Sequence, residues 1–217
     1  METISEDPGR ILLINKPLHW TSFDVVNKLR YKLKTKKIGH AGTLDPLATG
    51  LLIICVGKMT KRIEEFMGQE KEYTGKLIIG QTTVSHDLET SVSEQKDISA
   101  ITEELIRNTT SHFIGNIRQL PPQHSAIRIK GKRAYEFARE GKEIALAPRE
   151  VTIREFVIEK INLPEITFRV VCSKGTYIRS LVRDFGNQLE VGAYMAELCR
   201  TRIGNFRLED ASSMDQI

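Results

Sequence analysis

Short runs of apolar residues, and runs in which apolar and polar residues alternate, predict β-strands along the chain. These runs cover residues 11–14, 51–56, 73–79, 151–161, 166–172 and 203–208. In the longest run the pattern slips by one position near Glu155, which is typical of a β-bulge. The glycine-punctuated stretch 39–50 and the polar stretch 82–97 are expected to form loops.

Apolar residues at helical spacing predict helices between several of these strands. The predicted helices cover residues 22–33, 101–112, 134–140, 178–189 and 193–200. Thr21 and Ser22 can cap the first helix, and one of its stripes is expected to carry Phe23, Val26, Arg30 and Leu33. Because strands and helices alternate irregularly, the pattern favours an α+β fold with a mostly antiparallel mixed sheet flanked by helices and loops.

Length and composition indicate a globular chain with a core of its own, since 40% of its 217 residues are hydrophobic and 28% are charged. Residues 1–9 lack the apolar segment of a signal peptide, so we expect a disordered tail followed by one domain over 10–217. The longest apolar run, 51–56, is too short to span a bilayer. Three widely spaced cysteines indicate thiols in a reducing cytoplasm, and the scattered histidines predict no metal site.

Charge is unevenly distributed, although the net charge is only +4. Residues 28–37 hold six basic side chains and no acid, and residues 113–139 hold six basic side chains against the single acid Glu136. Such runs are often only solvated surfaces. Two of them beside loops rich in glycine and proline favour a polyanion as the partner.

The loop at 39–50 carries a single acid, Asp45, and three glycines that allow close approach of backbone or ligand. It is not a phosphate-binding P-loop, because no Gly-Lys-Ser/Thr sequence closes it. Its residues alone also allow a simple Asp-Pro turn, in which the carboxylate only caps local backbone.

The sequence GHAGTLDPLATGLL at 39–52 closely resembles the active-site motif of the bacterial TruB-type tRNA pseudouridine synthases. Further motifs of that family fit in the same order: Lys16-Pro17 with Thr21-Ser22, Lys71-Glu72-Tyr73, Ser125-Ala126 through Gly131–Tyr135, Cys172–Leu181, and Leu198 with Arg200-Thr201-Arg202. The resemblance covers about residues 10–210. His19 and His124 depart from it, standing where the family usually has a glycine and an aromatic residue.

The resemblance implies an isomerase that breaks the C1′–N1 bond of uridine 55 in the T loop of tRNA and rejoins the base through C5. No cofactor is expected, because the reaction needs neither a redox change nor a group donor. The implied nucleophile is Asp45, which Arg179 would keep ionised, while Tyr73 would stack on the base or assist proton transfer.

The resemblance also implies how RNA is held. Binding residues are expected at His40, Tyr177, Leu198, Lys16, Arg128, Lys130, Lys132 and Arg133. His40 would fill the space that the flipped base leaves, and the basic residues would hold phosphates. Tyr177 and Leu198 would line the pocket, or else be ordinary core residues. A mobile thumb-like insertion is expected at about 117–149.

The resemblance further implies that the T stem-loop is the partner and that the protein is a monomer in the cytoplasm. Many relatives continue into a small C-terminal domain of PUA type, but the chain stops at Ile217, so we expect no such domain and expect RNA binding to rest on the catalytic domain alone. Three alternatives remain open at this point. The chain could resemble guide-RNA-dependent archaeal and eukaryotic relatives, act as a non-catalytic tRNA-binding or tRNA-folding module, or be a basic α+β protein with another ligand.

Overall fold

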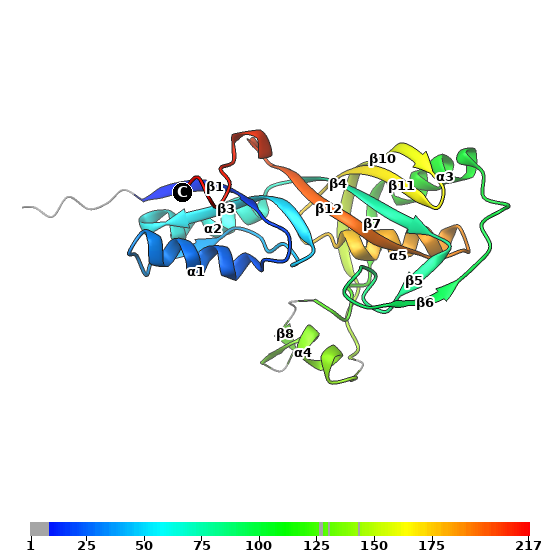
Figure 1. Ribbon diagram of the computed structural model, residues 1–217, viewed down its shortest axis with the longest axis horizontal. Helices are drawn as coiled ribbons and strands as arrows, with labels where there is room; N and C mark the ends of the chain where they lie inside the picture. The colour runs from blue at the N-terminus through cyan, green and yellow to red at the C-terminus, as the bar shows by residue number, and fades with distance from the viewer. Residues whose placement is uncertain (1–8, 126–127, 130, 143) are drawn as a thin grey trace, which may run out of the picture. The chain divides into compact units, whose positions relative to one another are not determined.

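The computed structural model describes residues 9–125, 128–129, 131–142 and 144–217. The chain forms two compact units (Figure 1). The first comprises the chain up to Tyr73 together with Leu198–Ile217, and the second comprises Thr74–Glu197. None of the helices in the described ranges has the length and apolar character needed to cross a bilayer.

The first unit is built on strand β3, which is buried on both faces. Its elements are β1 (Arg10–Lys16), α1 (Ser22–Lys32), β2 (Ile38–His40), β3 (Ala48–Val56), η1 (Gly57–Arg62), α2 (Ile63–Gly68), β13 (Phe206–Arg207), η3 (Leu208–Asp210) and the end of β12 (Ala193–Ile203). β1 and β2 pair with β3 in antiparallel fashion, whereas β12 pairs with it in parallel.

Alternate residues of β3 enter two separate cores, which explains its continuous apolar sequence. Leu52, Ile54 and Val56 pack with Val25, Val26 and Leu29 of α1. Leu51, Ile53 and Cys55 pack with Phe66 of α2 and with Ile203. The predicted strand 51–56 is therefore confirmed, and it begins three residues earlier than expected.

Helix α1 is confirmed with its predicted cap. The Thr21 hydroxyl accepts a hydrogen bond from the Asp24 amide, and the Asp24 carboxylate accepts one from the Thr21 amide, which is a capping box. The predicted stripe is partly wrong, because the buried residues are Ser22, Val25, Val26 and Leu29, while Phe23 is 57% exposed. A stripe shifted by one position fits the same sequence, and contact with β3 decides between the two.

The second unit packs helix α5 against a sheet in which β10 pairs with β11 and β7 in antiparallel fashion. Its elements are β4 (Lys71–Ile79, which starts in the first unit), β5 (Gln81–Thr83), β6 (Val92–Gln95), α3 (Glu103–Thr109), η2 (Thr110–Phe113), β7 (Gly115–Gln119), β8 (Arg128–Ile129), β9 (Lys132–Arg133), α4 (Ala134–Arg139), β10 (Arg149–Asn162), β11 (Glu165–Cys172), α5 (Ile178–Gln188) and the beginning of β12. The strand order is β12-β4-β11-β10-β7. The rings of Phe156 and Phe185 lie 5.3 Å apart and join α5 to β10.

The long strand β10 carries the expected irregularity. Its register with β11 shifts between Ile153 and Glu155, which confirms a bulge or equivalent irregularity, and it shifts again between Ile158 and Lys160. The pairs β10–β11 and β10–β7 are antiparallel, and β3–β12 is parallel. The structure therefore confirms an α+β fold with a mixed sheet.

Three sequence predictions are wrong in detail. Residues 193–200 form strand β12 instead of a helix, although Ala, Met, Glu and Leu favour helices. The neighbouring strands β3 and β4 offer pairing partners on both sides, and this tertiary context overrides local propensity. The supposed loop 82–97 contains the β5–β6 hairpin, and the predicted strand 203–208 is reduced to the short β12–β13 pairing.

Candidate active site

The loop that joins β2 to β3 carries Asp45 on a tight turn. The Ala48 amide donates a hydrogen bond to the Asp45 carbonyl at 3.0 Å, which closes a four-residue turn. The Ser22 hydroxyl accepts from the Leu44 amide at 2.8 Å and donates to the Leu44 carbonyl at 3.2 Å. The backbone on both sides of the half-buried Asp45 is therefore fixed.

A buried arginine clamps the same loop from the side of β12. Arg200 is 1% exposed and donates from Nε to the Leu51 carbonyl at 2.8 Å. Its Nη1 and Nη2 reach the carbonyls of Thr43 at 3.4 Å and Gly42 at 3.1 Å. Gly50 makes this approach possible, because a Cβ there would lie 2.4 Å from the Arg200 carbonyl oxygen and its φ is +102°.

A buried lysine holds the loop from the side of β1. Lys16 has no exposed surface, and its Nζ donates to the carbonyls of Pro17 at 2.8 Å, Trp20 at 2.6 Å and Pro46 at 3.4 Å. Burial lowers the pKa of Lys16 from 10.5 to about 8, while the Asp45 carboxylate opposes that change. The structure thus places Lys16, expected as a substrate-binding residue, in the interior and electrostatically coupled to Asp45.

Three other predicted site residues lie in the first unit. His40 ends β2, where it stands in register with Ile54. Leu198 is 8% exposed and pairs in register with Ala48, at the point where β3 begins, three residues after Asp45. Tyr73 is 8% exposed and belongs to the buried face of β4. The structure therefore brings Leu198 and Lys16 to the loop that carries Asp45.

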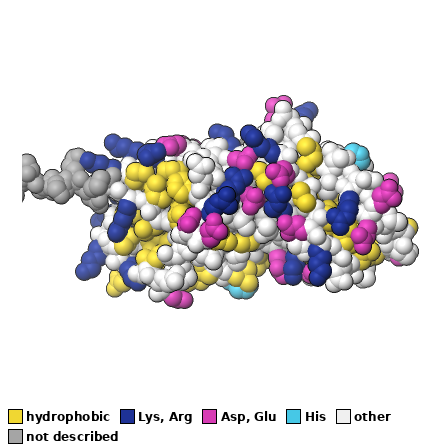
Figure 2. Space-filling model, turned by 90° about the horizontal axis from the view of Figure 1, so that it is seen from above, with side chains coloured by type: hydrophobic (Ala, Val, Ile, Leu, Met, Phe, Trp, Pro, Cys, Tyr) yellow, Lys and Arg dark blue, Asp and Glu magenta, His cyan; other side chains and the backbone are white. Residues whose placement is uncertain are grey.

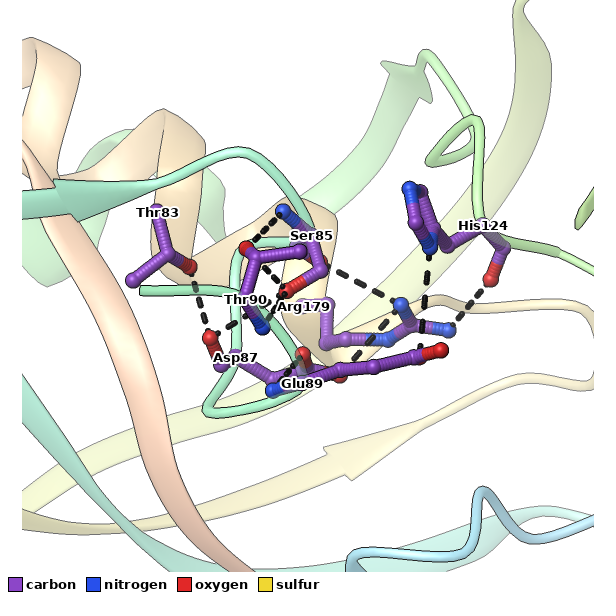
Figure 3. Close-up of polar contacts among 7 residues, drawn as sticks. All are labelled: Thr83, Ser85, Asp87, Glu89, Thr90, His124 and Arg179. Carbon is purple, nitrogen blue, oxygen red and sulfur yellow. Dashed lines mark hydrogen bonds and ion pairs between the residues drawn. The ribbon is translucent and has the colours of Figure 1, made fainter. Parts of the chain in front are cut away.

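Arg179 and Tyr177 lie at the N-terminal end of α5 in the second unit, where Arg179 enters a buried polar cluster (Figure 3). Arg179 Nη1 lies 3.4 Å from Asp87 Oδ2, and both side chains are only 4% exposed. The guanidinium also donates to the carbonyls of Ser85 at 3.2 Å and His124 at 2.7 Å. A carboxylate and two carbonyls therefore fix the plane of the guanidinium.

The loop around Asp87 is itself well connected. Asp87 Oδ1 accepts the Glu89 amide at 2.9 Å, and the Asp87 carbonyl accepts the hydroxyls of Thr83 at 2.7 Å and Ser85 at 3.2 Å. Burial, assisted by nearby guanidinium groups, lowers the pKa of His86 in the same loop to about 4, so this imidazole is neutral at pH 7.

The beginning of the expected thumb is attached to α5. Gln119 Oε1 accepts the Tyr177 amide at 2.8 Å, and the Ser180 hydroxyl donates to the Leu120 carbonyl at 2.8 Å. The Gln123 side chain bonds the backbone of Ile144, with Nε2 donating to its carbonyl at 2.8 Å and Oε1 accepting its amide at 3.2 Å. The two ends of the segment are thereby joined.

The predicted phosphate-binding residues fall in the middle of this segment. Lys132 is exposed, lies 4.0 Å from a Glu140 carboxylate oxygen, and stands 5.8 Å from the Phe137 ring. Arg128 and Arg133 pair in register between β8 and β9, and Lys130 lies outside the described residues. Their predicted role in binding RNA stays a prediction.

Surface charge is mixed on the face drawn in Figure 2, where Lys and Arg side chains lie among Asp and Glu side chains. Within the described ranges, no three His, Cys, Asp or Glu side chains are grouped so as to hold a metal ion. Among the described residues, Lys16 and Arg200 place buried positive charge beside the Asp45 loop, where they donate to the carbonyls of Pro46 and Gly42.

Sequence reasoning missed three residues that hold the candidate site together. Asp87 and Ser85 stand in a polar stretch with no periodicity, and only folding brings them to Arg179, more than 90 positions away. Arg200 was noted only as part of a motif. The polar residues Glu197, Thr201 and Arg202 stand close to Arg200 in β12, so the local sequence carries no signal that Arg200 would be buried.

Comparison with known proteins identifies the family. Residues 30–178 match the model of the TruB family pseudouridylate synthase N-terminal domain, and residues 179–217 match that of the tRNA pseudouridylate synthase B C-terminal domain. The chain belongs to the TruB family of pseudouridylate synthases, which confirms the resemblance seen in the sequence.

Two relatives of similar length are both named tRNA pseudouridine synthase B. The chain is 54% identical to tRNA pseudouridine synthase B of Flavobacterium johnsoniae, over 94% of this chain and 92% of the relative. It is 53% identical to tRNA pseudouridine synthase B of Phocaeicola vulgatus, over 95% and 91%. These relatives confirm the prediction of an enzyme, an isomerase, over the alternative of a non-catalytic tRNA-binding module.

Solved structures show the same fold. The chain resembles a chain of a Cbf5-Nop10-Gar1 complex with a TM-score of 0.74 and 29% identity, over 95% of this chain and 52% of that one. It therefore spans about half the length of that solved chain. A pseudouridylate synthase structure matches with a TM-score of 0.51 at 17% identity, which supports the fold alone.

Proposed function

We propose that this chain isomerises uridine 55 in the T loop of tRNA to pseudouridine, with Asp45 as the nucleophile. The observation that carries the proposal is the way the Asp45 loop is built. Its backbone is fixed by Ser22, Lys16 and Arg200, and two of these groups are buried cations. A carboxylate held rigidly beside positive charge is suited to act as an ionised nucleophile.

The proposed reaction has two covalent steps. An oxygen of Asp45 attacks C1′ of the uridine, and the electron pair of the C1′–N1 bond leaves with the base. After the base has turned, its C5 attacks C1′ and releases the Asp45 carboxylate. The C5 proton is then lost to a base and N1 takes up a proton, so the overall change is an isomerisation. Tyr73 stacks on the uracil or assists this proton transfer, and Arg179 supplies positive charge to the reaction.

We also propose the finer features of the substrate and of the working state. The T stem-loop suffices as substrate, because it contains the target uridine and the unpaired nucleotides around it. His40 occupies the space left by the flipped base, and Tyr177 and Leu198 line the pocket. The protein acts as a monomer in the cytoplasm.

The test is the Asp45→Asn variant with an unmodified tRNA transcript. The amide keeps the size of the side chain but removes the nucleophile, so single-turnover formation of pseudouridine should fall by at least about 10⁴-fold. Binding of tRNA, measured by mobility shift, should stay close to that of the parent protein.

The matched control is Asp97→Asn at an exposed position. Asp97 caps the Ser99 amide at 2.9 Å, and an asparagine can accept the same hydrogen bond. This variant should modify tRNA at the parent rate. Appreciable turnover by Asp45→Asn, or modification at another uridine, would contradict the proposal.

A further inference from the structure

One face of α1 carries exposed basic and aromatic side chains that the reaction at Asp45 does not use. We define the α1 surface as Phe23, Lys28, Arg30, Tyr31, Lys32 and Lys34. Tyr31 is 89% exposed and Phe23 is 57% exposed. In Figure 1 the strands of the first unit lie on one side of α1, and Val25, Val26 and Leu29 face that core.

The charge of this surface is not neutralised locally. No acidic residue occurs between Asp24 and Asp45, whereas six lysines and arginines do. Among the described residues, none of these six side chains forms an ion pair with a carboxylate. The Asp24 carboxylate is already engaged at the helix cap by Thr21. The α1 surface is therefore complementary to a polyanion.

Phe23 and Tyr31 lie along one side of the helix, with the cation of Arg30 beside them. Arg30 donates to the Asn27 carboxamide oxygen at 2.8 Å, and its guanidinium lies 5.8 Å from the Phe23 ring. Residues 23, 27 and 31 are spaced four apart and so lie on the same side of the helix. Lys28 is held 5.2 Å from the Trp20 ring. Flat rings beside fixed cations suit stacked nucleobases and their phosphates.

A lysine, Lys34, follows the C-terminal end of α1 at a position where glycine is usual. Its φ is +49°, in the left-handed region that favours glycine. Compared with glycine, a lysine at this position has a conformational cost, but it adds a positively charged side chain. Its charge adds to the α1 surface at the C-terminal end of the helix, whereas Ser22 at the N-terminal end contacts Leu44 of the loop that carries Asp45.

An anionic membrane fits this surface less well than RNA. The apolar side chains that a membrane-binding helix would insert are Val25, Val26 and Leu29, and all three are buried in the core. A ring on the surface can stack only on a base whose face is free, because bases inside a duplex are covered on both sides. The occupant is therefore an unpaired stretch of RNA.

We propose that the α1 surface binds an unpaired segment of the tRNA that lies outside the T stem-loop, with a base stacked on Tyr31. This inference rests on the proposed function. The T stem-loop offers one set of unpaired nucleotides, its loop, and the reaction at Asp45 uses that set. The additional segment adds affinity for intact tRNA without taking part in the chemistry.

The test compares the affinity of Tyr31→Ala for intact unmodified tRNA and for an isolated T-arm stem-loop. Loss of one stacked base should weaken binding of intact tRNA by about 5- to 150-fold. Binding of the stem-loop should change less than about twofold, since the stacked segment is absent from it. Tyr31→Phe keeps the ring and should bind intact tRNA like the parent.

Charge is tested separately with the double variant Lys28→Ala/Lys32→Ala. Its slope of log affinity against log salt for intact tRNA should be shallower by about 1.4 to 1.8, from two lost phosphate contacts. The matched control is Lys160→Ala, an exposed lysine of β10 that should leave the slope unchanged. Circular dichroism checks that each variant is folded.

Several outcomes overturn the inference. It fails if Tyr31→Ala binds intact tRNA like the parent, or if the stem-loop is weakened as much as intact tRNA. It also fails if Tyr31→Ala binds tRNA normally but loses binding to phosphatidylserine vesicles that the parent binds. Pseudouridine formation on the stem-loop by the same variants separates this failure from failure of the proposed function, in which the parent would be inactive as well.

Discussion

The buried pair formed by Arg179 and Asp87 allows a quantitative prediction. In Asp87→Asn the side chain keeps its volume and the oxygen that accepts the Glu89 amide, but the negative charge 3.4 Å from the guanidinium is lost. At that distance the attraction is about 5 kcal/mol for an effective dielectric constant of about 20. Removing one partner of a buried pair typically costs about 3–5 kcal/mol.

We expect a loss of about 3 kcal/mol in the free energy of unfolding, because an NH2 group replaces Oδ2 opposite the guanidinium, while the Ser85 and His124 carbonyls still accept from Arg179. For a chain of this size the loss corresponds to a fall in Tm of about 6–12 °C. The single-turnover rate at 25 °C should also fall, since the guanidinium loses one of the groups that fix its plane.

The assay is thermal unfolding followed by circular dichroism, with Asp184→Asn as the matched control. Asp184 accepts from Arg183 Nε at 2.8 Å, but the two side chains are 32% and 19% exposed. A pair that is partly solvated contributes at most about 1 kcal/mol. If the two variants unfold at the same temperature, the Asp87 carboxylate does not stabilise Arg179 and the reasoning is refuted.

Two further predictions concern side chains that hold backbone. Because the pKa of Lys16 is about 8 in the folded protein and 10.5 unfolded, the unfolded chain binds more protons between these pH values. Lys16 therefore makes the free energy of unfolding rise with pH in that window, by up to about 1.4 kcal/mol per pH unit. Urea unfolding at several pH values should show that Lys16→Met lacks this rise. An equal pH dependence of the parent and the variant would contradict the prediction. Gln123→Met removes both hydrogen bonds to Ile144, so amide exchange at Ile144 should accelerate and single-turnover rates should fall more than tRNA affinity; exchange at the parent rate would show that the link is dispensable.

The sequence predicted secondary-structure elements well where their signals lie within a few neighbouring residues. The capping box of α1, the apolar strand β3 and the alternating strand β11 all follow from residues within a few positions of one another. Residues 193–200 could not be assigned in this way, because the partners that make them a strand lie near residues 48 and 75. Pairing over such separations has no local signature.

The candidate site shows the same difference between local and distant residues. Asp45 and Arg179 each lie within a motif that is a continuous run of residues, so the sequence located both candidates. The groups that hold them are distant in the chain: Arg200 reaches the carbonyl of Gly42, and Arg179 pairs with Asp87. Those partners are carbonyls and one carboxylate in a polar stretch, which no pattern of residue types distinguishes from an ordinary loop.

The construction of the Asp45 loop explains why its interior contains two cations. Carbonyl oxygens of Gly42, Thr43 and Pro46 turn inward, and buried acceptors require donors. Neutral donors could satisfy them at a lower desolvation cost than the ammonium of Lys16, whose pKa burial has already lowered. Charged donors add a positive potential around the single carboxylate of the loop. That potential favours the ionised carboxylate that the proposed nucleophilic role of Asp45 requires, so the hydrogen bonds that fix the loop also suit it to that proposed role.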